Sequence, residues 1–323
     1  DKSLVIHTNV IGQALKTLEH HESVFKETDL AKALLPFTQD AEELVLALQA
    51  IKASDQLIYL GVGEDGRDRF TSRTMLELEN HIQKIADALK NNYHSPHAKL
   101  INRRIDTILN AYQKQLGKSL TGEQLLVVKH IVGPQQIACV VGRAGTGKSF
   151  SLGAARAVWE ARGLQVQGIA LSGIAADGLS KDAGIASRTI ESFRYGLENK
   201  TIALGSRDVV VMDEAGMTDS VSLLAVLKAI QQARAKLVLV GDPAQLQPVG
   251  PGATFRALLE RIGFAELQSV YRQKSAWQRE ATVAFSSGQI LQGLKAYFDA
   301  GCIHFAENES DTQQQLIADW QRL

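Results

Sequence analysis

The chain has 323 residues, of which 45% are hydrophobic and 22% charged, and its formal net charge is zero. A chain of this length buries about three quarters of its unfolded surface and suggests two domains, so disordered and fibrous architectures are excluded. Zero net charge excludes a protein that is basic all over, but it allows a local basic groove. The two cysteines form no disulfide framework, and the sequence has neither a signal peptide nor an apolar run of about 18 residues, so we expect a cytoplasmic protein without a membrane span.

Residues 1–116 are predicted to form a mostly helical domain with the element order of a winged helix. Apolar residues recur at helical spacing, and Asp40 with Glu43 resembles a capping box that opens a helix. A short apolar run, a turn rich in Gly and Asp, and a returning run indicate a β-hairpin. The expected order is helices over about 11–18, 29–35 and 40–51, a hairpin over 57–73, and further helices opening at Thr74 and His97.

Beyond Gly117 the chain alternates between apolar, β-branched runs and helical stretches. This alternation predicts an α/β fold with a parallel sheet that is buried on both faces. We expect one domain over 117–290 and the start of another over 291–323, with a strand at 302–305 and a helix at 313–321. The strands expected in the sheet are 137–141, 166–171, 209–212 and 237–240, with helices over 149–161 and 220–233 and broken helical stretches over 173–198.

The segment 142–149 reads GRAGTGKS and matches the phosphate-binding loop pattern G-x4-G-K-[ST]. Glycines let main-chain N–H groups converge on a phosphate, and the following helix directs its positive end at the same anions. In this interpretation Lys148 contacts the β- and γ-phosphates of ATP and Ser149 ligates Mg²⁺. The alternative is a glycine-rich turn, which the flanking strand and helix disfavour. The expected nucleotide-binding residues of the loop are Gly142, Arg143, Ala144, Gly145, Thr146, Gly147, Lys148 and Ser149.

Two adjacent carboxylates, Asp213 and Glu214, end the apolar run 209–212. The carboxyl ends of parallel strands meet at one edge of a sheet, where a phosphate-binding loop also lies. We therefore expect Asp213 to hold Mg²⁺ and Glu214 to polarise the attacking water. The alternative is an ordinary junction between a strand and a loop.

Other polar residues allow two interpretations from the sequence alone. Gln245 follows the run 237–240, where it either contacts the γ-phosphate or lies in a turn. Gln124, in TGEQ, either completes a capping box with Thr121, which the residues favour, or contacts adenine. Arg272 is either an arginine finger or a surface residue.

A single-stranded nucleic-acid track is one interpretation of four further residues, Ser172, Gly173, Arg188 and Thr189. Their composition also suits an ordinary loop.

Taken in order, these motifs resemble the first half of a superfamily 1 helicase. The resemblance is carried by LTGEQ at 120–124, GRAGTGKS at 142–149, VMDEAGM at 211–217, GDPAQLQPV at 241–249 and VYRQ at 270–273. It points to the RecD-like branch and, through residues 62–79, to the helicase portion of TraA-type conjugative relaxases. The implied fold is a RecA-like P-loop NTPase domain preceded by the winged-helix-like domain.

The resemblance implies an ATP-dependent motor that moves 5′ to 3′ on single-stranded DNA. It assigns adenine contact to Gln124, γ-phosphate sensing to Gln245 and the arginine finger to Arg272, and it reinforces Glu214 as the general base. It also implies a relaxase domain before Asp1 and a second motor domain after Leu323, so the chain is expected to be a monomeric fragment with slow hydrolysis. The RecD-like Thr-[Ile/Leu]-His signature reads Thr189-Ile-Glu191 here, which departs from the family. The alternatives are a RecD-like repair helicase and a non-enzymatic nucleotide-binding module that docks DNA or protein.

Overall fold

The computed structural model describes residues 8–92, 104–143, 145–245, 252, 254–269 and 275–321. The chain divides into two compact units, residues 1–143 with 147–268, and residues 144–146 with 269–323. The boundaries expected near 116 and 290 do not coincide with this division. The reason on the N-terminal side is that helices α4 (Arg73–Asn91) and α5 (Ile105–Leu116) bury side chains in the two cores that flank the sheet.

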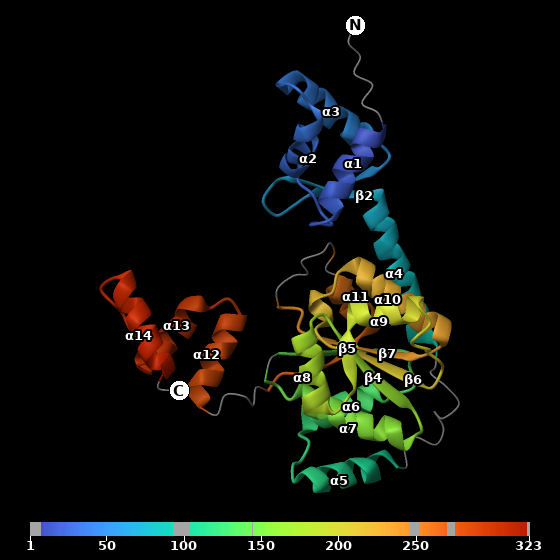
Figure 1. Cartoon of the computed structure of the whole chain (residues 1–323), viewed down its shortest axis with the longest axis vertical. Helices are drawn as coiled ribbons and strands as arrows, with labels where there is room; N and C mark the ends of the chain where they lie inside the picture. Colours follow the sequence, from blue (N-terminus) through green and yellow to red (C-terminus); the bar gives the residue numbers. More distant parts are fainter. Residues whose placement is uncertain are drawn as a thin grey trace. The chain divides into compact units, whose positions relative to one another are not determined.

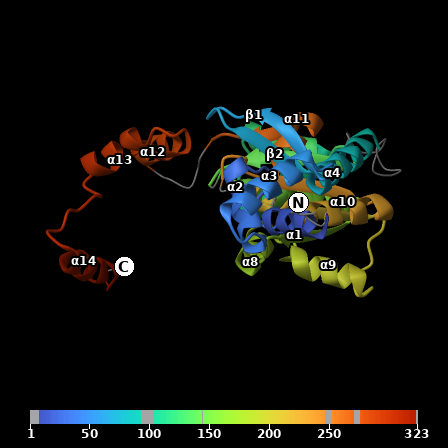
Figure 2. The same cartoon turned by 90° about the horizontal axis from the view of Figure 1, so that it is seen from above.

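The N-terminal part of the first unit has the expected order of three helices, a hairpin and a fourth helix. Asp40 caps α3 by accepting the Glu43 N–H at 2.8 Å, as predicted. Phe25 forms an isolated bridge with Phe70. The rings of these two residues belong to a separate apolar core, which they form with side chains of α1, α2 and α3. Figure 2 shows α2 and α3 beside the hairpin. The elements are α1 (Thr8–Glu19), α2 (Glu27–Leu34), the 3-10 helix η1 (Leu35–Phe37), α3 (Ala41–Ala53), β1 (Leu57–Val62) and β2 (Asp68–Ser72).

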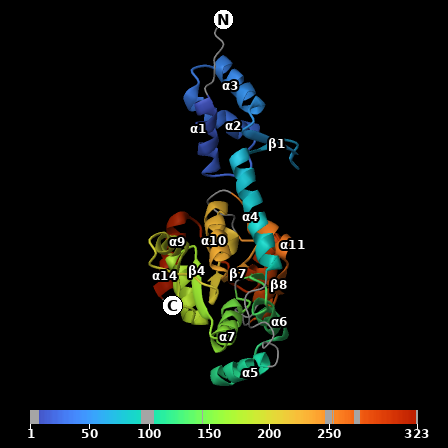
Figure 3. The ribbon, with the colours of Figure 1, turned by 90° about the vertical axis from the view of Figure 1, so that its right-hand side faces the viewer.

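Helix α4 runs without interruption from the hairpin into the sheet domain (Figures 1 and 3). It begins one residue earlier than expected, because the Ser72 hydroxyl accepts the Met75 N–H at 3.0 Å and so caps the helix. Its second half places Ile82, Ala86 and Leu89 in the core, where they are fully buried. The small N-terminal domain is therefore joined to the sheet domain by one continuous helix.

The sheet has six strands, all parallel, in the order β5-β4-β6-β7-β3-β8. This confirms the predicted parallel sheet. The central strands β3, β6 and β7 are buried along their whole length, as the continuous apolar runs indicated. The bounds are β3 (Ile137–Gly142), β4 (Gln165–Ala170), β5 (Ser187–Thr189), β6 (Asp208–Met212), β7 (Lys236–Gly241) and β8 (Phe264–Leu267).

Helices cover both faces of the sheet, with α10 and α11 on one side and α6 and α7 on the other (Figure 1). Alternate strand residues face opposite layers, so Ile137, Cys139 and Val141 join one core while Ala138 and Val140 join the other. The helices are α6 (Gly122–Ile131), α7 (Lys148–Ala161), α8 (Gly173–Ala183), α9 (Ile190–Glu198), α10 (Ser220–Ala233) and α11 (Thr254–Ile262).

Among its described residues, the second unit has three helices, α12 (Ala276–Ser286), α13 (Ile290–Asp299) and α14 (Glu309–Gln321). α12 and α13 form a hairpin in which the Trp277 and Tyr297 rings meet edge to face, with centroids 5.1 Å apart. The strand expected at 302–305 is wrong, since these residues form no regular structure, and the expected helix at 313–321 lies within α14. Within the described residues, no helix is both long and apolar enough to span a bilayer.

A lysine is buried at the start of β7, at the end of the sheet away from the phosphate-binding loop. Lys236 is 1% exposed, and its Nζ donates to the main-chain oxygens of Gly133 and Gln135 just after α6. Burial, reinforced by the nearby Arg162, lowers the pKa of Lys236 to about 7. An unfolded lysine titrates near 10.5. Between these two values the unfolded chain binds more protons than the folded chain, so the free energy of unfolding rises with pH in this window.

We expect the chain to gain stability by a few kcal/mol between about pH 7 and pH 10 through Lys236. Lys236→Met removes the titrating group, so its free energy of unfolding should change less with pH over the same range. Urea denaturation of both proteins at pH 6.5, 8 and 9.5 measures the difference. A constant difference between the two proteins at all three pH values would show that Lys236 stays charged in the folded chain.

Candidate nucleotide site and nucleic-acid edge

The loop between β3 and α7 has the backbone that a phosphate-binding loop requires. β3 ends at Gly142 and α7 begins at Lys148, so the loop leads directly into the first turn of a helix. Gly145 and Gly147 have φ values of +82° and +85°, in the left-handed region that glycine adopts readily. The first N–H groups of α7 lack acceptors within the helix and are available to an anion. Ala144 lies outside the described residues.

Gln124 lies at the start of α6 and is 5% exposed. Its Oε1 accepts the Thr121 N–H at 3.1 Å, while the Thr121 hydroxyl accepts the Gln124 N–H at 3.3 Å, so the capping box is confirmed. The other end of the same amide is close to the loop, because a Cβ added at Gly147 would lie 2.3 Å from the Gln124 Nε2. The cap therefore fixes the Gln124 side chain against the phosphate-binding loop, and its contact with adenine stays a prediction.

Asp213 and Glu214 follow β6 at the carboxyl edge of the sheet, as the sequence indicated. Glu214 has φ +56°, a conformation that costs a residue with a side chain on the order of 1 kcal/mol, and its N–H donates to Asp213 Oδ1 at 2.9 Å. Burial and the neighbouring Asp213 raise the pKa of Glu214, and the Lys148 ammonium opposes this rise. Asp213 and the loop lysine Lys148 thus both lie close enough to Glu214 to affect it electrostatically.

Two glycines, Gly216 and Gly241, bring the neighbouring strand ends into contact. A Cβ at Gly216, in the 3-10 helix η3 (Ala215–Met217), would lie 2.8 Å from the main-chain oxygen of Asp242. A Cβ at Gly241 would lie 2.9 Å from the Gly216 nitrogen and 3.0 Å from the Phe255 ring. The loop that follows Glu214 therefore packs directly against the loop that leads to Gln245. The motif letters marked these glycines, but only the tertiary contact gives the reason for them.

The remaining predicted catalytic residues are only partly placed. Gln245 is exposed, and its N–H donates to the Asp242 oxygen at 3.2 Å, so it lies in the turn after β7. The described residues offer no hydrogen-bond partner to its side-chain amide. Arg272 lies outside the described residues. Their roles stay predictions.

The four residues expected on a nucleic-acid track come from the ends of two adjacent strands, β4 and β5. Ser172 caps α8 by accepting the Ala175 N–H, and Thr189 caps α9 by accepting the Ser192 N–H, both at 3.1 Å. A capping hydroxyl can still donate its own hydrogen to a phosphate oxygen. Arg188 is exposed on β5, and a Cβ at Gly173 would meet nothing within 4 Å. The ends of β4 and β5 therefore present the N-termini of α8 and α9, the Arg188 guanidinium and open space at Gly173 to a nucleic-acid backbone.

The residues present fit a magnesium ion that is held mainly by phosphates and water. No cluster of three or more His, Cys, Asp or Glu suited to a metal occurs in the part of the chain that the structure describes. Mg²⁺ bound with a nucleotide commonly uses only one or two protein oxygens and keeps several waters. Ser149, in the first turn of α7, and Asp213, beside Glu214, supply that chemistry.

A parallel sheet with helices on both faces, a phosphate-binding loop after one strand and paired acids after another define a P-loop NTPase fold of the helicase type. A family model described as an AAA domain matches residues 119–308, which is more than half of the chain. The chain therefore belongs to this AAA-domain family.

Relatives agree with the resemblance inferred from the motifs. The conjugal transfer protein TraA of Rhizobium radiobacter is 36% identical over 316 residues, which is 95% of this chain and 28% of TraA. The ATP-dependent RecD2 DNA helicase of Deinococcus radiodurans is 30% identical over 167 residues, which is 50% of this chain and 23% of RecD2. The crystal structure of Pif1 helicase from Candida albicans aligns with a TM-score of 0.40 and 20% identity, covering 52% of this chain and 44% of Pif1. The chain thus spans little more than a quarter of TraA's length.

Proposed function

We propose that the chain is the first motor domain of an ATP-driven translocase that moves 5′ to 3′ on single-stranded DNA, within a conjugal-transfer protein of the TraA type. The observation that carries the proposal is that the phosphate-binding loop after β3 and the adjacent carboxylates after β6 lie at the carboxyl edge of one parallel sheet, where Lys148 and Asp213 both act electrostatically on Glu214. The similarity to TraA over 95% of this chain supports the conjugal role. We further propose that the chain acts as a monomer in the cytoplasm, with a relaxase domain preceding it in the full protein.

Each residue of the site has a distinct part in the proposed hydrolysis. Lys148 binds the β- and γ-phosphates and offsets their charge. Glu214 accepts a proton from the attacking water at a carboxylate oxygen, and its raised pKa makes it a stronger base than an ordinary carboxylate. Mg²⁺, held by Ser149 and Asp213, would neutralise charge that develops on the phosphate oxygens. Gln124 orients the loop through its contact with Gly147 and would also meet the adenine.

Coupling to DNA is supported by the position of the four proposed DNA-binding residues, which lie at the ends of two strands of the same sheet. Ser172, Gly173, Arg188 and Thr189 would hold the sugar-phosphate backbone at the ends of β4 and β5. Gln245 would sense the γ-phosphate, and its loop touches the loop after Glu214 through Gly216. Arg272 would stabilise the transition state. A second motor domain would complete the DNA grip, so the isolated chain should hydrolyse ATP slowly and sustain no unwinding.

The test is phosphate release by the chain with and without a 30-nucleotide single strand. We expect DNA to stimulate a slow basal rate, and Lys148→Ala to lower both nucleotide binding and hydrolysis at least about 100-fold. Lys228→Ala, which removes an exposed lysine on α10, is the matched control and should leave both unchanged. If calorimetry detects no binding when Mg-ATP is titrated into the folded chain, the proposal is wrong.

The direction of translocation is measured on the full-length protein. We expect it to displace streptavidin from the 3′ end of a single strand but not from the 5′ end.

A further inference from the structure

The helix that would read DNA in a winged-helix domain is chemically unsuited to that role here. In helix-turn-helix domains the second helix of the motif lies in the major groove and reads bases with Arg, Lys, Asn or Gln. The corresponding helix α3 exposes Glu42, Val45, Leu46 and Gln49. Its one lysine, Lys52, pairs with Glu27 of α2 at 2.8 Å. This surface is acidic and apolar, and acidic groups repel the phosphate backbone.

A hollow of about 470 Å³ lies between α2, α3 and the hairpin, and its lining includes Thr28, Ala31 and Leu48. Thr28, Ala31 and Leu35 follow one another at helical spacing along α2 and its C-cap, and Val45 and Leu48 are one turn apart on α3. Leu35 and Val45 are 54% and 53% exposed, which is unusual for side chains of this kind on packed helices. Leu35 and Val45 lie one turn from Ala31 and Leu48 on the same helix faces, and we call the hollow together with this apolar continuation the groove.

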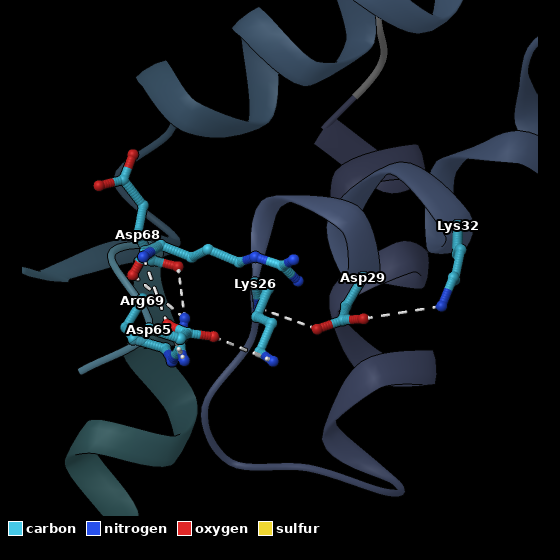
Figure 4. A network of polar contacts seen from close by, with 7 residues as sticks. Lys26, Asp29, Lys32, Asp65, Asp68 and Arg69 are labelled. Carbon is cyan, nitrogen blue, oxygen red and sulfur yellow. Dashed lines mark hydrogen bonds and ion pairs between the residues drawn. The ribbon is translucent and has the colours of Figure 1, made fainter. Parts of the chain in front are cut away.

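The walls of this hollow are held in place by polar contacts (Figure 4). Lys26, which precedes α2, pairs with Asp65 of the hairpin turn at 3.5 Å, and Arg69 pairs with the same carboxylate at 2.7 Å. Asp68, which lines the hollow, accepts the Tyr59 hydroxyl at 3.0 Å. The Lys26–Asp65 pair joins the hairpin turn to the start of α2, and the other two contacts order the hairpin itself, which lowers the entropic cost of binding.

The two ends of the groove differ in charge. The hollow is lined by two cations and two anions, whose charges balance: Lys26, Arg67, Glu27 and Asp68. At the other end Asp40, Glu42 and Glu43 gather at the start of α3, and Glu42 lies about 9 Å along the helix from Leu48. A partner that matches this pattern carries apolar side chains on one face and basic residues at the end that meets Glu42.

We propose that the groove between α2 and α3 binds a short amphipathic helix of a partner protein, with apolar residues at i, i+3 and i+4 in the groove. Its basic end lies toward Glu42. Two helices with small and apolar side chains between them leave a groove that accepts the ridge of a third helix, and Ala31 permits a close approach. The winged-helix domain is thus a protein-docking module, and the proposal is independent of the nucleotide site.

The test uses the whole chain as bait for a phage library of random 14-residue peptides. We expect the selected sequences to share apolar residues at i, i+3 and i+4, with Lys or Arg at one end. Fluorescence anisotropy then measures the selected peptide against variants of the chain. Ala31→Glu and Val45→Glu should each weaken binding at least tenfold, and Glu42→Lys should weaken it severalfold. Leu126→Glu, which alters a 67% exposed leucine on α6, is the matched control and should bind as the parent does.

Two results would overturn the proposal. One is a library that returns no apolar consensus, or a consensus peptide whose affinity is the same for Ala31→Glu and the parent. The other is a 20-nucleotide single strand that loses affinity on Val45→Glu while the peptide does not, which would make this face a nucleic-acid surface. Thermal unfolding followed by circular dichroism identifies variants that fail to fold, and each variant is compared at a temperature where it is folded. We expect Lys148→Ala, which loses ATP hydrolysis, to bind the peptide as the parent chain does. A failure of the proposed motor function can therefore be distinguished from a failure of this proposal.

Discussion

Replacing Glu214 with glutamine should abolish most ATP hydrolysis while Mg-ATP still binds. The amide keeps the shape of the side chain but cannot take a proton from water, so we expect the turnover rate to fall by about 10²–10⁴. Binding should persist because Lys148 and the glycines of the loop are unchanged. Steady-state phosphate release gives the rate, and titration with a fluorescent ATP analogue gives the affinity.

The pH dependence provides an internal check on the same residue. Since burial and Asp213 raise the pKa of Glu214, kcat/KM of the parent chain should rise with pH through a value above the ordinary 4.5 of a glutamate. This rise of kcat/KM with pH should be absent from the residual activity of Glu214→Gln. Glu198→Gln, at the exposed end of α9, is the control and should retain both rate and profile. An unchanged rate in Glu214→Gln would favour a non-enzymatic nucleotide-binding module.

Gly216→Ala should separate nucleotide binding from turnover. The new methyl group would lie 2.8 Å from the Asp242 oxygen, so the loop after Glu214 and the loop before Gln245 must move apart. A misplacement of about 1 Å can lower a rate about 10²-fold, so the shift of roughly half an ångström needed here should lower turnover about tenfold. We expect turnover to fall by that order while the affinity for Mg-ATP changes little, because the phosphate-binding loop does not contain this glycine. Phosphate release and analogue titration measure the two quantities.

The matched control for this substitution is Gly178→Ala in the interior of α8. A Cβ there would meet nothing within 4 Å, and alanine favours a helix over glycine, so activity should persist and stability should rise slightly. Gly216→Ala is expected to lose about 1–3 kcal/mol of unfolding free energy through overpacking. Urea denaturation defines conditions in which both variants are fully folded. Equal turnover in the two variants under those conditions would remove Gly216 from any role in linking the loops.

The central sheet and the nucleotide site were predictable because both are encoded locally. Continuous β-branched runs mark β3, β6 and β7, and a motif of eight residues fixes the loop between β3 and α7. The edge strands β5 and β8 were missed because Ser187–Thr189 is too short for a pattern and Phe264–Leu267 is only partly buried. Their pairing is supplied by β4 and β3, which no local signal reports.

Other features required tertiary contacts that the sequence does not display. Lysine is usually exposed, so nothing in the sequence marks Lys236 as buried beneath the end of α6. The strand expected at 302–305 has the right composition but no neighbour to pair with among the described residues. For Gln124, the capping box was visible as a spacing of three residues, whereas its closeness to Gly147 depends on the packing of α6 beside α7.

The continuous helix α4 has a mechanical consequence. Its 19 residues span about 28 Å, and its second half is held on α11 by the Arg261–Asp87 ion pair at 2.6 Å. α11 also carries Phe255, whose ring abuts Gly241 beside the loop that leads to Gln245. A rotation of the small domain about α4 would therefore also move α11 and, with it, the Phe255 ring beside the two loops that touch at Gly216 and Gly241.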